Sequence, residues 1–202
     1  MSPRPTTGHV RRPAILTAAA AVIAERGVIG TRIADVAERA DTSAPGVLYW
    51  FASKDELLTE ALAFSDDRFY AQLGDELARL DSGRARLTRI VELWPAEGDD
   101  EAVLWMELWV RALRDPTVNA ARARLDARWR AAIADVVREG QMAGEFGDED
   151  PEAFALTLGA LMDGFAIQLA LRDPAVTPEL VKRHCMALVE ERLGLEGVTD
   201  GG

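Results

Sequence analysis

The chain has 202 residues, 49% of them hydrophobic, and one cysteine, Cys185. This length suits one large domain or a small domain joined to a larger one, and a single thiol excludes an internal disulfide and fits a reducing cytosol. The formal net charge of −11 argues against a nucleic-acid-binding protein that is basic throughout. The charge is unevenly distributed, however: residues 1–54 hold seven basic and four acidic residues, and the remainder holds 16 basic and 30 acidic ones. A basic segment on an acidic body can turn one face towards phosphate, although a short window also reaches this balance by chance.

The first elements predicted along the chain are a flexible arm and a helix. Residues 1–12 are polar and rich in Pro and Arg, and they carry no apolar signal core, so we expect an arm and no secretion signal. An apolar stripe at helical spacing then runs over residues 13–26. Gly27 is the expected end of this first helix.

Two short helices and a long one follow. Thr31 is a candidate N-cap for the second helix, and Thr42 or Ser43 is one for a brief third helix. A capping box that begins at Ser53 opens a long fourth helix.

Five further helical segments follow a break at residues 81–83, and the chain shows no strand alternation and no internal repeat. We therefore predict an all-α fold of about nine helices. The last five helices are expected over about 84–94, 100–114, 118–142, 151–172 and 178–193.

The longest apolar run, residues 153–171, approaches the length of a membrane span. Asp163 near its middle would cost about 3 kcal/mol in a bilayer. We therefore expect a buried helix of a soluble, cytoplasmic protein that does not contact a membrane.

The second and third predicted helices form a helix-turn-helix, because they are short, are joined by a three-residue turn and are braced by a helix on each side. Hydroxyls near the helix starts are natural phosphate donors, and the start of the third helix would read bases. Its first residues offer no side-chain donor or acceptor, so we expect apolar contacts such as those to thymine methyl groups. The candidate DNA-binding residues are Thr31, Arg32, Thr42, Ser43, Ala44, Pro45, Tyr49, Trp50 and Lys54.

Residues 12–62 resemble the TetR family of one-component regulators. The stretch TRIADVAERA is similar to the family's second helix, and SAPGVLYWFASKDELL, from Ser43 to Leu58, is similar to its recognition helix and the start of helix four. The resemblance implies a homodimer on double-stranded, near-palindromic operator DNA, with repression as the usual outcome. It also implies that Phe51 is a core residue and that Tyr49, Trp50 and Lys54 lie near phosphate; the alternative is that Tyr49 and Trp50 only pack.

The sequence departs from the family at Pro45-Gly46, where polar residues are frequent. Sequence-specific binding is therefore expected to depend on DNA shape and on the side chains of Arg32, Thr42, Ser43 and Tyr49.

The C-terminal region resembles the subset of the same family that includes the choline-responsive betaine-pathway repressor. The stretches WMELWVRALRD, REGQMAGEF and ALMDGFAIQLALRD carry this likeness. It implies a helical ligand-binding domain whose last two helices form a four-helix interface with a second copy. The apolar run at residues 153–171 agrees with this, because a helix that is apolar all round must be covered on every side.

We expect the effector to enter a cavity walled by aromatic side chains. On a helical wheel Trp105 and Trp109 fall together with Met106 at their flank, and Trp94 and Trp129 lie on neighbouring segments. The alternative is that these tryptophans are only core residues.

Asp163 is the expected polar anchor of this cavity, because a buried carboxylate must be neutralised, hydrogen-bonded or matched by a cation. We therefore expect a small effector with a positive charge, held by the acid and by cation–π contacts. The alternative is that Asp163 lies at the dimer seam, on a face of small residues.

The sequence shows no nucleophile elbow, no paired metal ligands and no phosphate-binding loop. We therefore expect no enzyme activity, no metal and no cofactor; a helical architectural or partner-binding protein is the remaining alternative. The predicted organisation is an arm (1–12), a helix-turn-helix domain (13–55), a ligand-binding and dimerisation domain (56–195) and a flexible tail (196–202).

Overall fold

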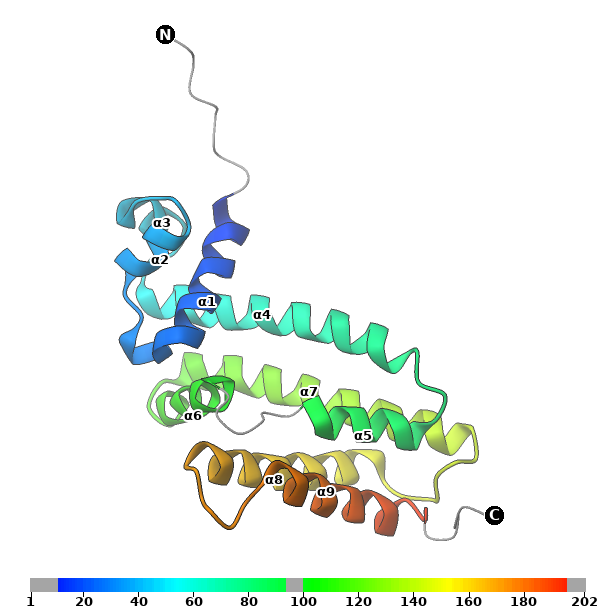
Figure 1. The fold of residues 1–202 in the computed structure, drawn as a ribbon. Helices are drawn as coiled ribbons and strands as arrows, with labels where there is room; N and C mark the ends of the chain where they lie inside the picture. The colour runs from blue at the N-terminus through cyan, green and yellow to red at the C-terminus, as the bar shows by residue number, and fades with distance from the viewer. Residues whose placement is uncertain (1–10, 94–99, 196–202) are drawn as a thin grey trace. The chain divides into compact units, whose positions relative to one another are not determined.

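A computed structural model describes residues 11–93 and 100–195, and within these ranges all regular structure is helical (Figure 1). The all-α prediction is confirmed, and the helix bounds differ from those expected by at most four residues at either end. The predicted tail, Trp94 and most of the predicted arm lie outside the described residues. The helices are α1 (Arg11–Gly30), α2 (Ile33–Arg39), α3 (Ala44–Trp50), α4 (Lys54–Leu77), α5 (Gly83–Leu93), α6 (Asp100–Ala112), α7 (Pro116–Met142), α8 (Pro151–Ala170) and α9 (Pro178–Arg192).

The chain forms two compact units that divide between Ala71 and Gln72, inside α4. The sequence analysis places the division at residues 55/56, where the capping box opens that helix. The first half of α4 belongs to the N-terminal unit because it buries Leu57, Leu58 and Ala61.

The N-terminal unit is a helix-turn-helix braced by α1 and the start of α4. Gly27 interrupts α1 with φ 69°, a left-handed conformation that favours glycine. The predicted caps of the later helices are present: Ser43 Oγ accepts the Gly46 N–H at 3.2 Å, and Ser53 Oγ accepts the Glu56 N–H at 3.1 Å. Phe51 is fully buried, as the family resemblance implies.

The predicted cap at Thr31 is wrong. The N-cap of α2 is Arg32, whose side chain makes no capping hydrogen bond. The Thr31 hydroxyl instead donates to the Gly27 carbonyl at 2.7 Å, and the residue is 1% exposed. The Gly27 carbonyl also accepts the backbone N–H of Thr31 at 3.1 Å, so both donors of Thr31 are held inside the unit.

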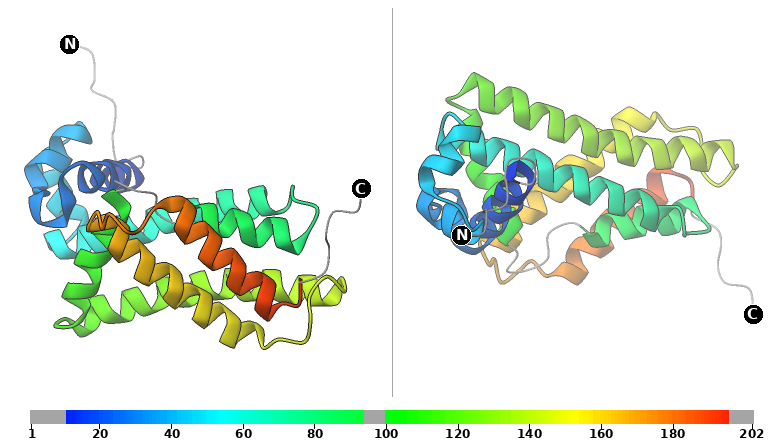
Figure 2. Two further views of the ribbon diagram at one scale, coloured as in Figure 1. Left: turned by 60° about the horizontal axis from the view of Figure 1, so that its bottom comes forward. Right: turned by 90° about the horizontal axis from the view of Figure 1, so that it is seen from above.

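The C-terminal unit is a bundle built on α7 and α8, which lie side by side (Figure 1). Helix α9 lies along α8, α5 packs on both α7 and α9, and α6 packs on α7 and α8 (Figure 2). Helix α8 is long and apolar enough to cross a membrane by composition alone. In this fold it is the central helix of the unit, because its neighbours bury Phe154, Leu158 and Met162 completely.

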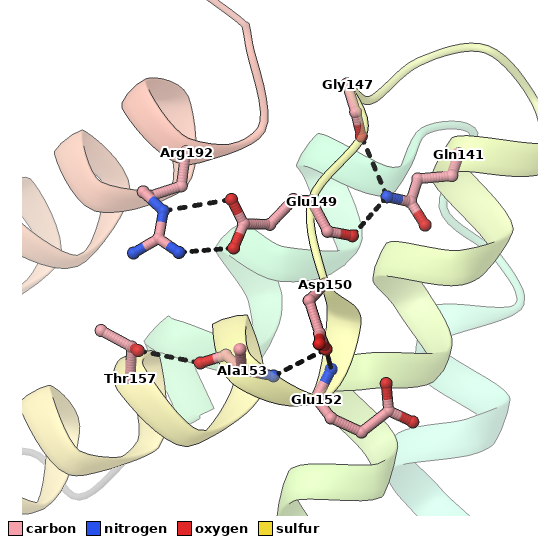
Figure 3. A network of polar contacts seen from close by, with 8 residues as sticks. All are labelled: Gln141, Gly147, Glu149, Asp150, Glu152, Ala153, Thr157 and Arg192. Atoms are coloured by element: carbon pink, nitrogen blue, oxygen red, sulfur yellow. Dashed lines mark hydrogen bonds and ion pairs between the residues drawn. The ribbon is translucent and has the colours of Figure 1, made fainter.

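The turn between α7 and α8 joins the ends of several helices (Figure 3). The Gln141 side-chain amide donates to the carbonyls of Gly147 and Glu149 at 2.9 and 2.7 Å, and the Glu149 carboxylate pairs with Arg192 at the end of α9. Asp150 then caps α8 by accepting the N–H groups of its first turn.

The aromatic ring of Phe146 completes this junction. Phe146 is 7% exposed, and its ring lies where Cβ atoms on Gly140 and Gly83 would stand, 2.2 and 2.6 Å from the nearest ring carbons. The neighbouring Glu145 carboxylate accepts the Gly83 N–H at 2.6 Å. The C-terminus of α7 is thereby tied to the start of α5.

We expect Gly140→Ala to lower the free energy of unfolding by about 1–3 kcal/mol, because the new methyl group would displace a buried ring. Gly74→Ala in α4 is the matched control, since no atom lies within 4 Å of its Cβ position. That substitution should leave stability unchanged or raise it by up to about 1 kcal/mol. Urea titration measures both, and equal stability of the two variants would contradict this role for Phe146.

Candidate DNA-binding surface and effector site

Helix α3 turns one face into the N-terminal unit and the other to solvent. Val47 is fully buried, whereas Pro45, Leu48 and Tyr49 are exposed. Of the predicted base-reading residues at its start, Pro45 is therefore accessible and Ala44 is half-buried. Leu48, which the sequence analysis does not single out, is 49% exposed.

Tyr49 does not pack into its own domain. It is 81% exposed, and its ring makes an edge-to-face contact with Trp50 at a centroid distance of 5.4 Å. Trp50 is 36% exposed. The hydroxyl of Tyr49 is thus free to reach a phosphate, while Trp50 supports its ring.

The basic side chains of the helix-turn-helix fall into two groups. Arg26 pairs with Asp35 and Arg39 pairs with Glu25, and Arg12 pairs with Glu60 of α4. By contrast, Arg32 and Lys54 form no ion pair among the described residues, and Lys54 Nζ lies 3.5 Å from the Ile29 carbonyl. Among the described side chains of this unit, Arg32 and Lys54, both predicted from the sequence, therefore remain available for phosphate.

The three predicted hydroxyl contacts differ in accessibility. Thr31 is buried and bonded to Gly27, so it leaves the candidate surface. Ser43 is exposed, although its oxygen already accepts the Gly46 N–H. Thr42 is half-buried, and its Oγ1 lies 2.6 Å from where a Cβ on Gly46 would stand.

The predicted effector-site tryptophans are less deeply buried than expected. Among the described side chains of α6, Leu108 is deeply buried, at 4% exposure, while Trp105, Met106 and Trp109 are half-buried. Trp129 in α7 is buried. Because α6 packs on both α7 and α8, the helices that carry these rings and Asp163 converge in one unit.

Asp163 lies on the side of α8 that faces charged residues of α7. Burial raises the pKa of Asp163 to about 6; the nearby Asp126 carboxylate adds to the rise, and Arg130 and Arg122 oppose it. Burial also raises the pKa of Asp126, against the charges of Arg122 and Arg130. Asp163 is therefore a partly buried acid whose ionisation is opposed by a second acid of its own chain.

These α7 residues were not predicted as site residues from the sequence, although their spacing indicates that they share one face of the helix. Arg122, Asp126 and Arg130 recur every four residues, and Trp129 falls on the same side of the helix. Arg122 pairs with Asp126 and also donates from Nε to Asn119 Oδ1 at 3.1 Å. Helix α7 thus presents a charged row with an aromatic ring to the helix that carries Asp163.

Among the described residues, the remaining reactive side chains form no second candidate site. Cys185 is buried, and burial raises the pKa of its thiol to about 11, so it is a packing residue. Within residues 11–93 and 100–195, no group of three or more His, Cys, Asp or Glu side chains could hold a metal ion.

Comparison with known proteins agrees with both units. Residues 15–61 match the family model described as bacterial regulatory proteins, tetR family, and residues 81–194 match the model described as BetI-type transcriptional repressor, C-terminal. The HTH-type transcriptional regulator BetI of Burkholderia mallei (strain NCTC 10229) is 28% identical over 186 residues, covering 86% of this chain and 89% of that one.

Two solved structures share the whole fold. A transcriptional regulator from Saccharomonospora viridis in complex with choline is 30% identical, with a TM-score of 0.78, over 93% of this chain and 98% of the other. A TetR-family transcriptional regulator from Rhodococcus sp. is 31% identical, with a TM-score of 0.76, over 91% of this chain and 98% of the other.

We expect Asp163→Asn to stabilise the protein at neutral pH. The pKa of this carboxyl is near 3.8 in the unfolded chain and about 6 in the folded one, so the folded state binds its proton more tightly. The stability that this proton contributes is complete below pH 3.8 and is lost as the pH rises through about 6. The asparagine variant, which has no such loss, should exceed the wild type by roughly 1–3 kcal/mol at pH 7.5 after allowance for solvent screening.

Urea unfolding at pH 4 and at pH 7.5, at one protein concentration, measures this difference. Asp173→Asn, in the turn after α8, is the control: it keeps an oxygen that can accept the Ala175 N–H and should not stabilise the protein at pH 7.5. An Asp163→Asn variant that is less stable than the wild type at pH 7.5 would contradict the prediction.

Proposed function

This chain belongs to the TetR family of bacterial regulatory proteins and carries a BetI-type C-terminal domain, and from this we propose that it represses transcription at a two-fold symmetric operator until a small cation releases it. Proteins of this family are DNA-binding transcriptional regulators and not enzymes, and regulators with this fold respond to small ligands. The operator symmetry, the homodimer and the charge of the effector are our inferences, as is a place of action in the cytoplasm, where the DNA is.

The observation that carries the DNA-binding part is the pattern of ion pairs in the N-terminal unit. Arg12, Arg26 and Arg39 are neutralised within the chain, and Arg32 and Lys54 are not. Together with the exposed hydroxyl of Tyr49, they supply contacts that fix the position of a helix-turn-helix on the phosphate backbone. Most of the acidic side chains of the chain, 25 of 34, lie in the other unit.

The uncovered side of α8 supports the proposal of a homodimer. Leu156 is 58% exposed, Ala160 and Gly164 are exposed, and no atom lies within 4 Å of a Cβ position on Gly164. These small and apolar residues recur along one line of the helix, and a second copy of α8 can approach closely there. A two-fold dimer doubles the DNA contacts and sets its recognition helices roughly one DNA turn apart, about 34–36 Å.

A positively charged effector fits the environment of Asp163. A carboxylate that is half-buried beside a second acid is costly, and a cation bound between them would remove that cost. Trp129 of α7, with Trp105 and Trp109 of α6, supplies aromatic faces on the helices that pack around α8. The choline bound to the similar regulator from Saccharomonospora viridis supports a quaternary ammonium as the first compound to test.

We expect Lys54→Ala and Tyr49→Phe to weaken binding to all DNA sequences by about the same factor, because phosphate contacts carry little sequence information. The loss of Lys54 should reduce the salt dependence of log Kd by about one per half-site. Fluorescence anisotropy with specific and scrambled duplexes at several salt concentrations measures both effects. Arg39→Ala is the matched control, since it removes the same charge from a side chain that already pairs with Glu25. A change in the preferred bases of Lys54→Ala would contradict the assignment of Lys54 to phosphate.

We expect choline to quench or shift tryptophan fluorescence and to release the wild-type protein from its operator. Asp163→Asn should remain a dimer by light scattering and bind the operator with unchanged affinity, but lose the response to choline by more than about 10-fold in concentration. The uncharged carbon isostere of choline is the ligand control and should act on neither protein. A variant that still responds normally, or that becomes monomeric, would show that Asp163 is not the anchor.

A further inference from the structure

The outward face of α3 presents Leu48 to solvent with no polar side chain beside it that can read a base edge. Leu48 is 49% exposed although its helix neighbour Val47 is fully buried. Pro45, one turn earlier on the same side, is also exposed. The helix that the fold places to enter a DNA groove thus offers two neighbouring apolar side chains to a partner.

The residues around Leu48 offer few side-chain groups for hydrogen-bonded readout. Gly46 carries no side chain, and a Cβ there would stand 2.6 Å from Thr42 Oγ1, so larger residues are excluded without a shift of Thr42. The Ser43 hydroxyl already accepts the Gly46 N–H. Tyr49, at the next position, is 81% exposed, and we propose that its hydroxyl contacts phosphate.

The major groove of DNA offers one apolar feature on its base edges, the C5-methyl group of thymine. We propose that Leu48, supported by Pro45, reads a thymine methyl group in each half of the operator and is the principal base-reading residue of this regulator. The inference rests on the proposed function and adds to it the chemistry by which the operator is distinguished. It makes the operator readout mainly hydrophobic, with Leu48 and Pro45 as the apolar contacts that α3 offers to the bases.

The test first selects the preferred sites of the full-length wild-type protein from random duplex DNA. Each thymine of the selected site is then replaced in turn by deoxyuridine, symmetrically in both half-sites, which removes the methyl group and keeps every hydrogen-bonding atom. We expect one symmetric pair of replacements to weaken binding about 4-fold per half-site, or about 15-fold in total, which corresponds to one lost methyl contact in each half.

The same replacement should have less than about a 2-fold effect on Leu48→Ala, because the methyl group then has no partner. Leu48→Met keeps an apolar side chain of similar reach and should retain the preference for thymine. Leu113→Ala is the matched control, since Leu113 is 85% exposed at the end of α6 in the other unit, and it should behave as the wild type. Thermal unfolding of the variants checks that an exposed substitution has left the fold intact.

The outcomes separate this inference from the proposed function. If the selected operator lacks a thymine at its constant positions, or if deoxyuridine weakens Leu48→Ala as much as the wild type, Leu48 does not read a methyl group, although the regulator still binds its operator. If selection yields no preferred sequence at all, both the inference and the proposed function fail.

Discussion

The C-terminal unit depends on the burial of α8. This helix has two ionisable side chains in 20 residues, Glu152 in its first turn and Asp163 near its middle, so nearly its whole circumference must be removed from water. Helices α7, α9 and α6 cover one side of it, and α5 closes the bundle between α7 and α9. The side that they leave open carries Leu156, Ala160 and Gly164, and we propose that a second copy covers it.

The same burial gives Asp163 its chemical character. An acid in an apolar helix is costly when ionised, and the neighbouring Asp126 makes it more so, while Arg122 and Arg130 only partly compensate. Apolar packing alone would favour a neutral side chain there. If a bound cation removes this electrostatic cost in one conformation of the protein, it binds that conformation more tightly. Such a difference in affinity between two conformations is what a ligand-driven switch requires.

The N-terminal unit solves a different electrostatic problem. It must bind a polyanion although the chain as a whole is strongly acidic. Ion pairs inside the unit neutralise Arg12, Arg26 and Arg39 and stabilise the arrangement of α1, α2 and α4. Arg32 and Lys54 remain as cations for phosphate, while the exposed face of α3 is nearly free of charge. Affinity from phosphate contacts and discrimination by base contacts are thus assigned to different side chains.

The sequence by itself determined the helical fold class, the helix-turn-helix and nearly all helix bounds, because apolar periodicity, caps and breaks depend on residues within a few positions of one another. It also singled out Lys54 and Tyr49, through the family resemblance, and Asp163, as an acid within an apolar run, as candidate site residues. Only the tertiary structure decided that Thr31 is buried, that α4 is divided between the two units, that Leu48 is exposed, and that Asp126 lies close to Asp163. These facts depend on contacts between residues far apart in the chain: the pair of Arg12 with Glu60 spans 48 positions, and Asp163 meets its partners across the packed faces of α7 and α8. Local spacing contains no information about which distant helix covers a residue, and that covering determines its burial, its charge and its availability to a ligand.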